Sequence, residues 1–240
     1  MPAISEQLIR EIATANPAAA RVFEDLGIDY CCGGNRSLRA ACASANVPVE
    51  TVLGRLETCR QPSESSAWNH APLGDLTRHI VDRHHGFVRR ESPRILSLLD
   101  KVSKKHGPAH PELSQISDLF ACLAAELAEH MTKEERILFP YIEALSGPAE
   151  PSACFASVES PIQVMIADHE NAGAILSKIR ALTSGYRTPG DACAAFQTLY
   201  RLLEDFERDL HWHVHLENNI LFPRAIAAEQ ERSKAPALAR

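Results

Sequence analysis

Apolar residues recur at helical spacing along almost the whole chain, and alternating apolar and polar runs are nearly absent. After Ala71 this pattern predicts four long helices, over residues 72–106, 112–146, 159–182 and 190–230. Gly107-Pro108, residues 147–151 and residues 184–190 separate them, because glycine ends helices and proline cannot continue them. Long amphipathic helices joined by short turns are typical of an up-down-up-down four-helix bundle.

The N-terminal part of the chain carries shorter helical patterns. Three apolar residues fall on one face of a first short helix: Ile4, Leu8 and Ile12. Two later stretches, residues 38–45 and 49–56, repeat the i, i+3, i+4, i+7 spacing. A polar, serine-containing stretch then indicates a linker. The sequence therefore predicts an all-α protein with a small N-terminal helical domain (1–60), a linker (61–71) and a bundle (72–240).

Composition and charge exclude several classes of function. The net charge is −6 and the acidic and basic residues are interspersed, so no basic surface for nucleic acid is expected. The first twenty residues include Glu6, Arg10 and Glu11, which interrupt any signal-peptide core. No apolar run approaches the ~18 residues of a membrane helix. We expect a cytoplasmic protein, a monomer or homodimer, that binds neither nucleic acid nor membrane.

One eleven-residue phrase occurs twice, at residues 130–140 and 213–223, with the shared pattern H-x3-E-x2-I-L-F-P. Positions i and i+4 of a helix lie on the same face, so each phrase offers an imidazole beside a carboxylate. A single pair of this kind is usually solvated or salt-bridged. Two copies with the same apolar tail instead indicate a metal site in the core of a bundle.

The spacing of four histidines supports this interpretation. In an antiparallel helix pair, residues at one level are equidistant from the turn between the helices. The interval is 45 residues from His85 to His130 and 44 residues from His169 to His213, and the midpoints fall at predicted turns. The second half of the bundle therefore looks like a copy of the first. Helical periodicity does not distinguish His85 from the adjacent His84.

The resulting ligand set is four histidines and two glutamates at one level of the bundle. Imidazole nitrogen combined with carboxylate oxygen suits iron or manganese. Six ligands are too many for one tetrahedral zinc ion, so we expect two metal ions with Glu134 and Glu217 bridging them. Cations between the two carboxylates would remove the cost of burying like charges together.

The chain has seven cysteines, whose spacing matches neither a disulfide framework nor a CxxC metal site. Most are interpreted as small buried residues, Cys122 among them. Cys31-Cys32 differs, because a turn with exposed amides before Gly33-Gly34 would lower a thiol pKa and make the pair redox-active or open to nitrosation. The alternative is a structural turn in which the cysteines are incidental.

Taken together, the motifs resemble the hemerythrin-like superfamily, and more closely the iron-sulfur cluster repair di-iron proteins, also called the repair-of-iron-centres family. The resemblance covers nearly the whole chain and rests on five motifs: DYCCGG (29–34), RHH (83–85), HMTKEE (130–135), DHE (168–170) and HVHLENN (213–219). It implies a hemerythrin-like bundle that holds two non-haem iron ions through His85, His130, Glu134, His169, His213 and Glu217. The histidine of this family stands two residues after the arginine, which favours His85 over His84.

One departure from the oxygen-carrying hemerythrins bears on function. Their third helix supplies two histidines as H-x3-H, whereas here His169 is followed four residues later by Gly173. One ligand fewer leaves an open coordination position. Open positions favour reaction with small molecules over reversible carriage.

The resemblance implies repair of iron-sulfur clusters damaged by nitrosative or oxidative stress, with damaged iron-sulfur proteins as clients. Two mechanisms fit: delivery of iron to damaged clusters, or binding and reduction of nitric oxide at the di-iron centre. Nitric oxide or oxygen species would be the small ligands. Cys31 and Cys32 are the candidate catalytic thiols, which would pass electrons or accept a nitrosyl group. Whether the protein is an enzyme, of the nitric oxide reductase type, stays open. The alternatives are a hemerythrin-like oxygen or redox sensor and a structural zinc bundle.

Overall fold

The computed structural model describes residues 4–16, 18–58, 68–147 and 154–234, and these residues are predominantly helical. No β-strand occurs among them; the one extended pairing is an isolated bridge between Leu8 and Ser37. None of the described helices combines the length and the apolar character that a bilayer crossing requires. The all-α class is confirmed, and the chain divides into two compact units.

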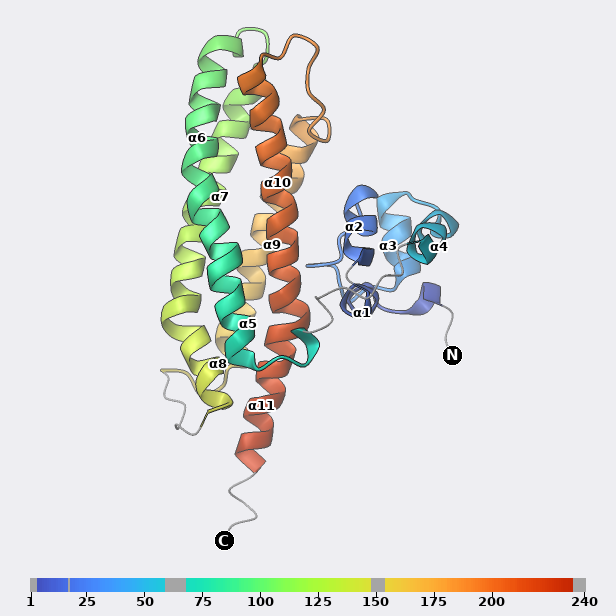
Figure 1. Cartoon of the computed structure of the whole chain (residues 1–240), viewed down its shortest axis with the longest axis vertical. Helices are drawn as coiled ribbons and strands as arrows, with labels where there is room; N and C mark the ends of the chain where they lie inside the picture. The colour runs from blue at the N-terminus through green and yellow to red at the C-terminus, as the bar shows by residue number, and fades with distance from the viewer. Residues whose placement is uncertain (1–3, 17, 59–67, 148–153, 235–240) are drawn as a thin grey trace. The chain divides into compact units, whose positions relative to one another are not determined.

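One unit comprises residues 79–140 and 160–210 and contains most of the length of four long helices. Figure 1 shows these helices side by side: α6 (Gly86–His106), α7 (Glu112–Lys133), α9 (Glu159–Leu182) and α10 (Ala194–Leu216). Three shorter helices extend them, with one π-helical segment at each junction: α5 (Leu73–His79) and η3 (Ile80–His85), η4 (Glu134–Leu138) and α8 (Phe139–Leu145), η5 (Glu217–Leu221) and α11 (Phe222–Lys234). The four predicted long helices are thus confirmed.

Apolar residues three or four positions apart form the core of this unit, as an amphipathic helix requires. The buried apolar residues on α6 and α7 include Val88, Ile95, Leu99, Val102, Leu113, Ile116, Phe120, Leu123, Leu127 and Met131. From α10, Phe206 meets Phe120 edge to face, with ring centroids 5.1 Å apart. Each fully buried side chain of this size contributes about 1.5–3 kcal/mol.

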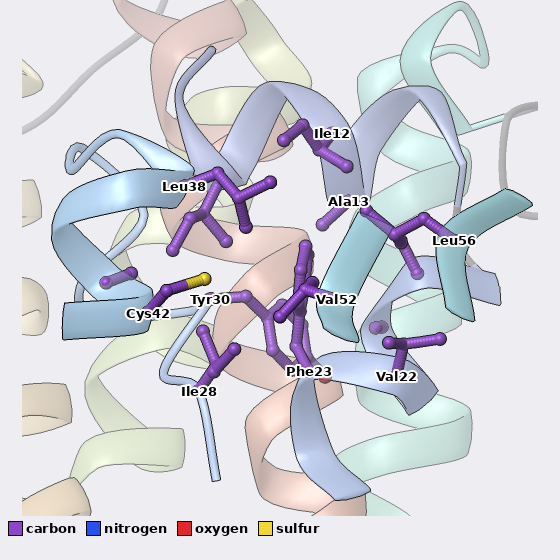
Figure 2. Packing of buried hydrophobic residues seen from close by; sticks show 14 residues of the cluster. Ile12, Ala13, Val22, Phe23, Ile28, Tyr30, Leu38, Cys42, Val52 and Leu56 are labelled. Carbon is purple, nitrogen blue, oxygen red and sulfur yellow. The ribbon is translucent and has the colours of Figure 1, made fainter. Parts of the chain in front are cut away.

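The other unit contains the N-terminal helices and the ends of the long ones, residues 1–78, 141–159 and 211–240. Its short helices are η1 (Ile4–Glu6), α1 (Ile9–Ala15), α2 (Ala18–Asp25), α3 (Leu38–Ala45) and α4 (Val49–Thr58). They enclose a core of their own, in which Phe23 and Tyr30 face Leu38 and Val52 (Figure 2). Helices α3 and α4 confirm the patterns at residues 38–45 and 49–56.

The predicted apolar face at the N-terminus is wrong in part. Ile12 is buried, but Ile4 is 40% exposed and Leu8 is only half-buried. The reason is that the chain is extended at Leu8, where it pairs with Ser37, so α1 begins only at Ile9. Residues 4 to 12 therefore do not form the single helix that their spacing predicted.

The predicted linker lies largely outside the described residues, which begin again at residue 68. Its last part is fixed by Arg224 of α11, whose guanidinium donates hydrogen bonds to the carbonyls of Trp68 and Ala71. Of the six cysteines that the structure describes, only Cys31 and Cys42 are buried, so the interpretation of most cysteines as small buried residues is wrong. The interpretation of Cys122 as a core residue is wrong, because it lies on the exposed side of α7 and donates to Glu126.

Candidate metal centre

All six predicted ligands lie in the long helices and are buried. His85 ends η3, His130 lies near the end of α7, and Glu134 begins η4. His169 lies in the middle of α9. His213 is near the end of α10 and Glu217 begins η5. Both glutamates are 0% exposed, a position that a carboxylate occupies only with compensating positive charge or hydrogen bonds.

The structure gathers these side chains into two overlapping groups. One contains His85, Glu134, His213 and Glu217, and the other contains His130, Glu134, His169 and Glu217. Within each group, one ligand atom from every residue lies within 4.8 Å of the others. Only the two glutamates belong to both groups. This is the arrangement of two ion positions that share two carboxylates.

The distances within the groups fit ligation. The oxygens of Glu134 face different histidines: Oε1 lies 3.3 Å from His130 Nε2, and Oε2 lies 3.3 Å from His85 Nε2. His130 Nε2 is 3.1 Å from His169 Nε2, and His213 Nε2 is 3.0 Å from Glu217 Oε1. Two atoms that bind one ion at about 2.1 Å and at a right angle to each other lie about 3 Å apart. The donor atoms therefore converge as metal ligands do.

The second ring nitrogens of two ligand histidines contact carboxylates. His85 Nδ1 lies 2.6 Å from Glu135 Oε1, which also accepts a hydrogen bond from Arg89. Such a contact fixes the orientation of a ligand ring and raises its basicity. Because Glu135 follows Glu134 directly, one short stretch of η4 supplies both a ligand and the partner of another ligand.

Asp168 does the same for His130, whose Nδ1 lies 3.3 Å from Asp168 Oδ2. Burial opposes ionisation of Asp168. Hydrogen bonds with Lys133 and His130 outweigh the effect of burial, so the pKa of Asp168 is lowered. The contacts of Glu135 and Asp168 were not predicted from the sequence. Both residues stand directly beside a predicted ligand in the chain, in the HMTKEE and DHE motifs, and this position is the signal that could have indicated them.

The adjacent histidines His84 and His85 are both buried but have different partners. His84 Nδ1 lies 3.0 Å from Asp209 Oδ2, and its ring packs edge to face against His79. Of the two, His85 has the nitrogen that faces Glu134. No sequence motif indicated Asp209, which lies on α10, far from His84 in the chain.

Three of the six ligands lie at an end of a π-helical segment. His85 ends η3, Glu134 begins η4 and Glu217 begins η5. Such segments are rare and are frequent at functional sites. Pro140 and Pro223 follow η4 and η5 within two residues, where a missing backbone N–H helps the change of hydrogen-bond register. Neither proline ends its helix, since α8 and α11 continue beyond them.

The candidate catalytic thiols lie in the loop between α2 and α3. Cys31 is buried and Cys32 is half-buried, and their sulfurs are 3.9 Å apart and not joined as a disulfide. They form a separate group with Asp29. Asn219 of η5 donates to the carbonyls of Tyr30 and Cys31, at 3.4 and 3.5 Å, and so ties this loop to the helix that carries Glu217.

The helices and the His/Glu groups define the class of protein: a metal-binding helical bundle of the hemerythrin type. A family model described as "Hemerythrin HHE cation binding domain" matches residues 76–225. A second, described as "Domain of Unknown function (DUF542)", matches residues 5–60. Both matches agree with the resemblance inferred from the motifs.

Curated relatives narrow the class. An iron-sulfur cluster repair protein YtfE from Pectobacterium carotovorum subsp. carotovorum is 35% identical over 228 residues, which cover 95% of this chain and 100% of the relative. A protein of the same name from Musicola paradisiaca is 34% identical, over 93% of this chain and 98% of the relative. Another, from Escherichia coli O6:K15:H31, is also 34% identical, over 95% of this chain and 100% of the relative. The chain belongs to this family of hemerythrin-like iron-sulfur cluster repair proteins.

Proposed function

We propose that the protein repairs iron-sulfur clusters damaged by nitrosative or oxidative stress, and that it does so with two iron ions in the bundle. The observation that carries this proposal is the pair of overlapping His/Glu groups with two shared carboxylates. The relatives at 34–35% identity, which are named as iron-sulfur cluster repair proteins, support the biological role. The clients would be iron-sulfur proteins, and a reducing compartment such as the cytoplasm suits the thiol pair.

The donor set favours iron over zinc. Imidazole and carboxylate ligands suit iron and manganese, whereas structural zinc takes four ligands in a closed tetrahedron. We assign one ion to His85, His213 and the shared carboxylates Glu134 and Glu217. The second ion would be held by His130, His169 and the same two carboxylates. Metal analysis with Mössbauer spectroscopy tests the assignment, and two zinc ions per chain in protein purified without added metal would contradict it.

Two mechanisms fit this site, delivery of iron to a damaged cluster and reduction of nitric oxide. Gly173 stands on α9 one turn after His169 and offers no ligand, so a small molecule would face no protein ligand from this position. A pair of ferrous ions would supply the electrons for reduction. The chain's own residues hold the ions and exclude bulk water, since all six ligands are at most 2% exposed.

The reduction mechanism can be tested directly. Two nitric oxide molecules, two electrons and two protons give nitrous oxide and water. The anaerobic diferrous protein is mixed with nitric oxide, and nitrous oxide is measured by gas chromatography. We expect product above the buffer control. A yield no higher than buffer rejects reduction and leaves iron delivery, which transfer of radiolabelled iron to a nitrosylated client cluster would measure.

We further propose that Cys31 and Cys32 take part in repair, by passing electrons or accepting a nitrosyl group. Their sulfurs are close to each other, and Cys32 is partly accessible. A variant with Cys31→Ser and Cys32→Ser should repair a nitrosylated cluster more slowly while its iron content is unchanged. A Cys122→Ser variant, in which an exposed thiol elsewhere is removed, is the matched control. Equal repair rates in the double variant and the control would exclude the thiols from the mechanism.

A further inference from the structure

A second set of metal-type ligands lies outside the bundle, in the loop between α2 and α3. One carboxylate oxygen of Asp29 and the sulfurs of Cys31 and Cys32 all lie within 4.8 Å of one another. The residues on either side of Asp29, Ile28 and Tyr30, are buried in the core of the N-terminal helices, which anchors the loop (Figure 2). The ligand atoms are therefore presented from a fixed backbone.

Hydrogen bonds hold this backbone in a tight turn. Asp29 Oδ1 accepts from the backbone N–H groups of Cys31 and Cys32 at 3.1 and 3.0 Å, and Oδ2 accepts from the N–H of Gly33 at 2.9 Å. A side chain at Gly33 would crowd the turn, because a Cβ atom there would lie 3.0 Å from both the backbone carbonyl oxygen and Oδ2 of Asp29. The turn thus keeps the carboxylate and both sulfurs on the same side.

The distances match those of a tetrahedral metal site. The two sulfurs are 3.9 Å apart, and Cys31 Sγ is 3.4 Å from Asp29 Oδ1. Two thiolates at about 2.3 Å from an ion lie about 3.8 Å apart in tetrahedral geometry, and a thiolate and a carboxylate oxygen lie about 3.6 Å apart. These two distances differ from the ideal values by no more than a few tenths of an ångström, and the third, from Cys32 Sγ to the carboxylate, is at most 4.8 Å.

We propose that Asp29, Cys31 and Cys32 form a second metal site, which binds one divalent transition-metal ion such as ferrous iron through two thiolates and one carboxylate. Binding releases the two thiol protons to solvent, so that the two thiolates offset the charge of the divalent ion and the carboxylate gives the site a net charge of −1. Asp29 is exposed and Cys32 half-buried, so the remaining coordination position is open to solvent and the ion is exchangeable.

The predicted lowering of a thiol pKa in this turn is wrong for Cys31, because the backbone N–H groups of the turn donate hydrogen bonds to the carboxylate of Asp29. The hydrogen bond with Cys32, followed by burial and the charges nearby, raises the pKa of the Cys31 thiol well above its ordinary value. A cation beside the sulfur would reverse this effect, since it stabilises the thiolate. Iron in iron-sulfur clusters is held by cysteine thiolates, so the site would offer ferrous iron the same type of ligand outside the bundle.

The test uses cobalt(II) as a spectroscopic probe on the full-length protein, with its bundle already loaded with iron, under anaerobic conditions with a phosphine reductant. We expect a thiolate-to-cobalt charge-transfer band that saturates at one equivalent. It should vanish in the variant with Cys31→Ser and Cys32→Ser, and Asp29→Asn should weaken binding by about tenfold or more. Cys193→Ser, the matched control, removes a thiol beside His106 and should retain the band.

A second measurement needs no variant and so does not depend on folding. Zinc should protect Cys31 and Cys32 of the wild-type chain from alkylation, as measured by peptide mass spectrometry, and leave Cys122 as reactive as before. The absence of a cobalt band in the wild type, a band unchanged in the double variant, or equal alkylation of the pair with and without zinc would each overturn the proposal. None of these readouts depends on repair activity.

Discussion

At the scale of single residues, two of the proposed ligand histidines contact carboxylates that stand next to other proposed ligands in the chain. Glu135 follows Glu134 but contacts His85, and Asp168 precedes His169 but contacts His130. Successive helical residues point about 100° apart, so the neighbour of an inward-facing ligand faces the adjacent helix. One short motif can therefore supply a ligand to the site and orient a ligand of the next helix.

Loss of one of these carboxylates should weaken metal binding without removing a ligand. In Asp168→Asn, His130 loses its charged partner, and we expect iron affinity to fall roughly 10–100-fold. Competition with a colorimetric chelator measures the affinity. Glu170→Gln is the control. Glu170 follows His169 directly in the chain and is exposed, so this substitution should leave iron affinity unchanged. Equal affinity of Asp168→Asn and the wild type would show that the contact does not orient the ligand.

Cys193 is the residue with the clearest shift in thiol acidity. A hydrogen bond from the backbone N–H of Phe196 and the contact with His106, whose Nε2 lies 3.2 Å from the sulfur, lower the pKa of Cys193 to about 7. Exposed Cys122 differs, because its hydrogen bond with Glu126 raises its pKa. The two thiols thus differ in thiolate fraction at neutral pH, and the thiolate is the reactive form.

We therefore expect Cys193 to react with iodoacetamide before Cys122. The thiolate fraction grows as pH rises through the pKa, so the rate at Cys193 should increase between about pH 6 and about pH 8 with a midpoint near 7. Peptide mass spectrometry after brief alkylation measures both sites in one sample. A midpoint near that of an ordinary thiol, or faster reaction at Cys122, would contradict the assignment.

At the scale of elements, the sequence predicts the long helices well and fails where helical geometry changes. Residues 112–146 and 159–182 are strongly periodic, and α7, η4, α8 and α9 occupy these ranges almost to the residue. The choice between His84 and His85 could not be made from periodicity, because both lie in η3, where hydrogen bonds span five residues instead of four. A period of 3.6 residues does not apply there.

Contacts between distant elements are the other part that the sequence does not predict. Glu229 of α11 accepts hydrogen bonds from the hydroxyl of Tyr141 on α8, from that of Ser157, and from the backbone N–H of Val158 ahead of α9. Burial opposes ionisation of Glu229, but these hydrogen bonds outweigh it and lower the pKa of the carboxyl. One side chain thus connects the ends of three helices.

Replacing Glu229 should destabilise the protein in a pH-dependent way. A carboxyl whose pKa is lowered by folding stabilises the native state above its unfolded pKa of about 4.3, and this contribution is lost as pH falls through the lower, folded value. Glu229→Gln should lower the free energy of unfolding by about 1–2 kcal/mol at pH 7, and by less below about pH 4. Urea unfolding at pH 7 and below about pH 4 measures the two free-energy differences, and Glu231→Gln, at an exposed position, is the control. A deficit independent of pH would contradict this explanation.

At the scale of the whole molecule, the proposed metal ligands lie on α7, α9 and α10 and on the π-helical segments η3, η4 and η5, so metal binding at these residues would be linked to stability. The duplicated phrase and equal histidine intervals predicted this set because the site repeats on two helix pairs. Asp209 and Asn219 were not predicted, since their partners, His84 and the loop at Tyr30, depend on packing between distant segments. The division at residues 1–60, 61–71 and 72–240 stays a prediction.

Removal of the metal should therefore destabilise the whole protein. Two buried carboxylates, Glu134 and Glu217, then share one site without a cation, at a cost in electrostatic free energy. Metal at a hundredfold excess over its dissociation constant contributes about 2.7 kcal/mol, which for a chain of this size is about 5–10 °C in the unfolding temperature. Calorimetry of the wild type with and without a strong chelator measures the shift.

Variants identify the source of this shift. The double variant Glu134→Gln, Glu217→Gln should show no response to chelator, and in the metal-free state it should unfold at or above the temperature of the metal-free wild type, because neutral amides do not repel each other.

His85→Gln should reduce the chelator response, whereas His84→Gln should retain it, since His84 contacts Asp209 and not Glu134. If chelator leaves the wild-type unfolding temperature unchanged, the six residues do not hold a metal that stabilises the fold. If His84→Gln loses the response and His85→Gln keeps it, the ligand assignment between the two adjacent histidines is reversed.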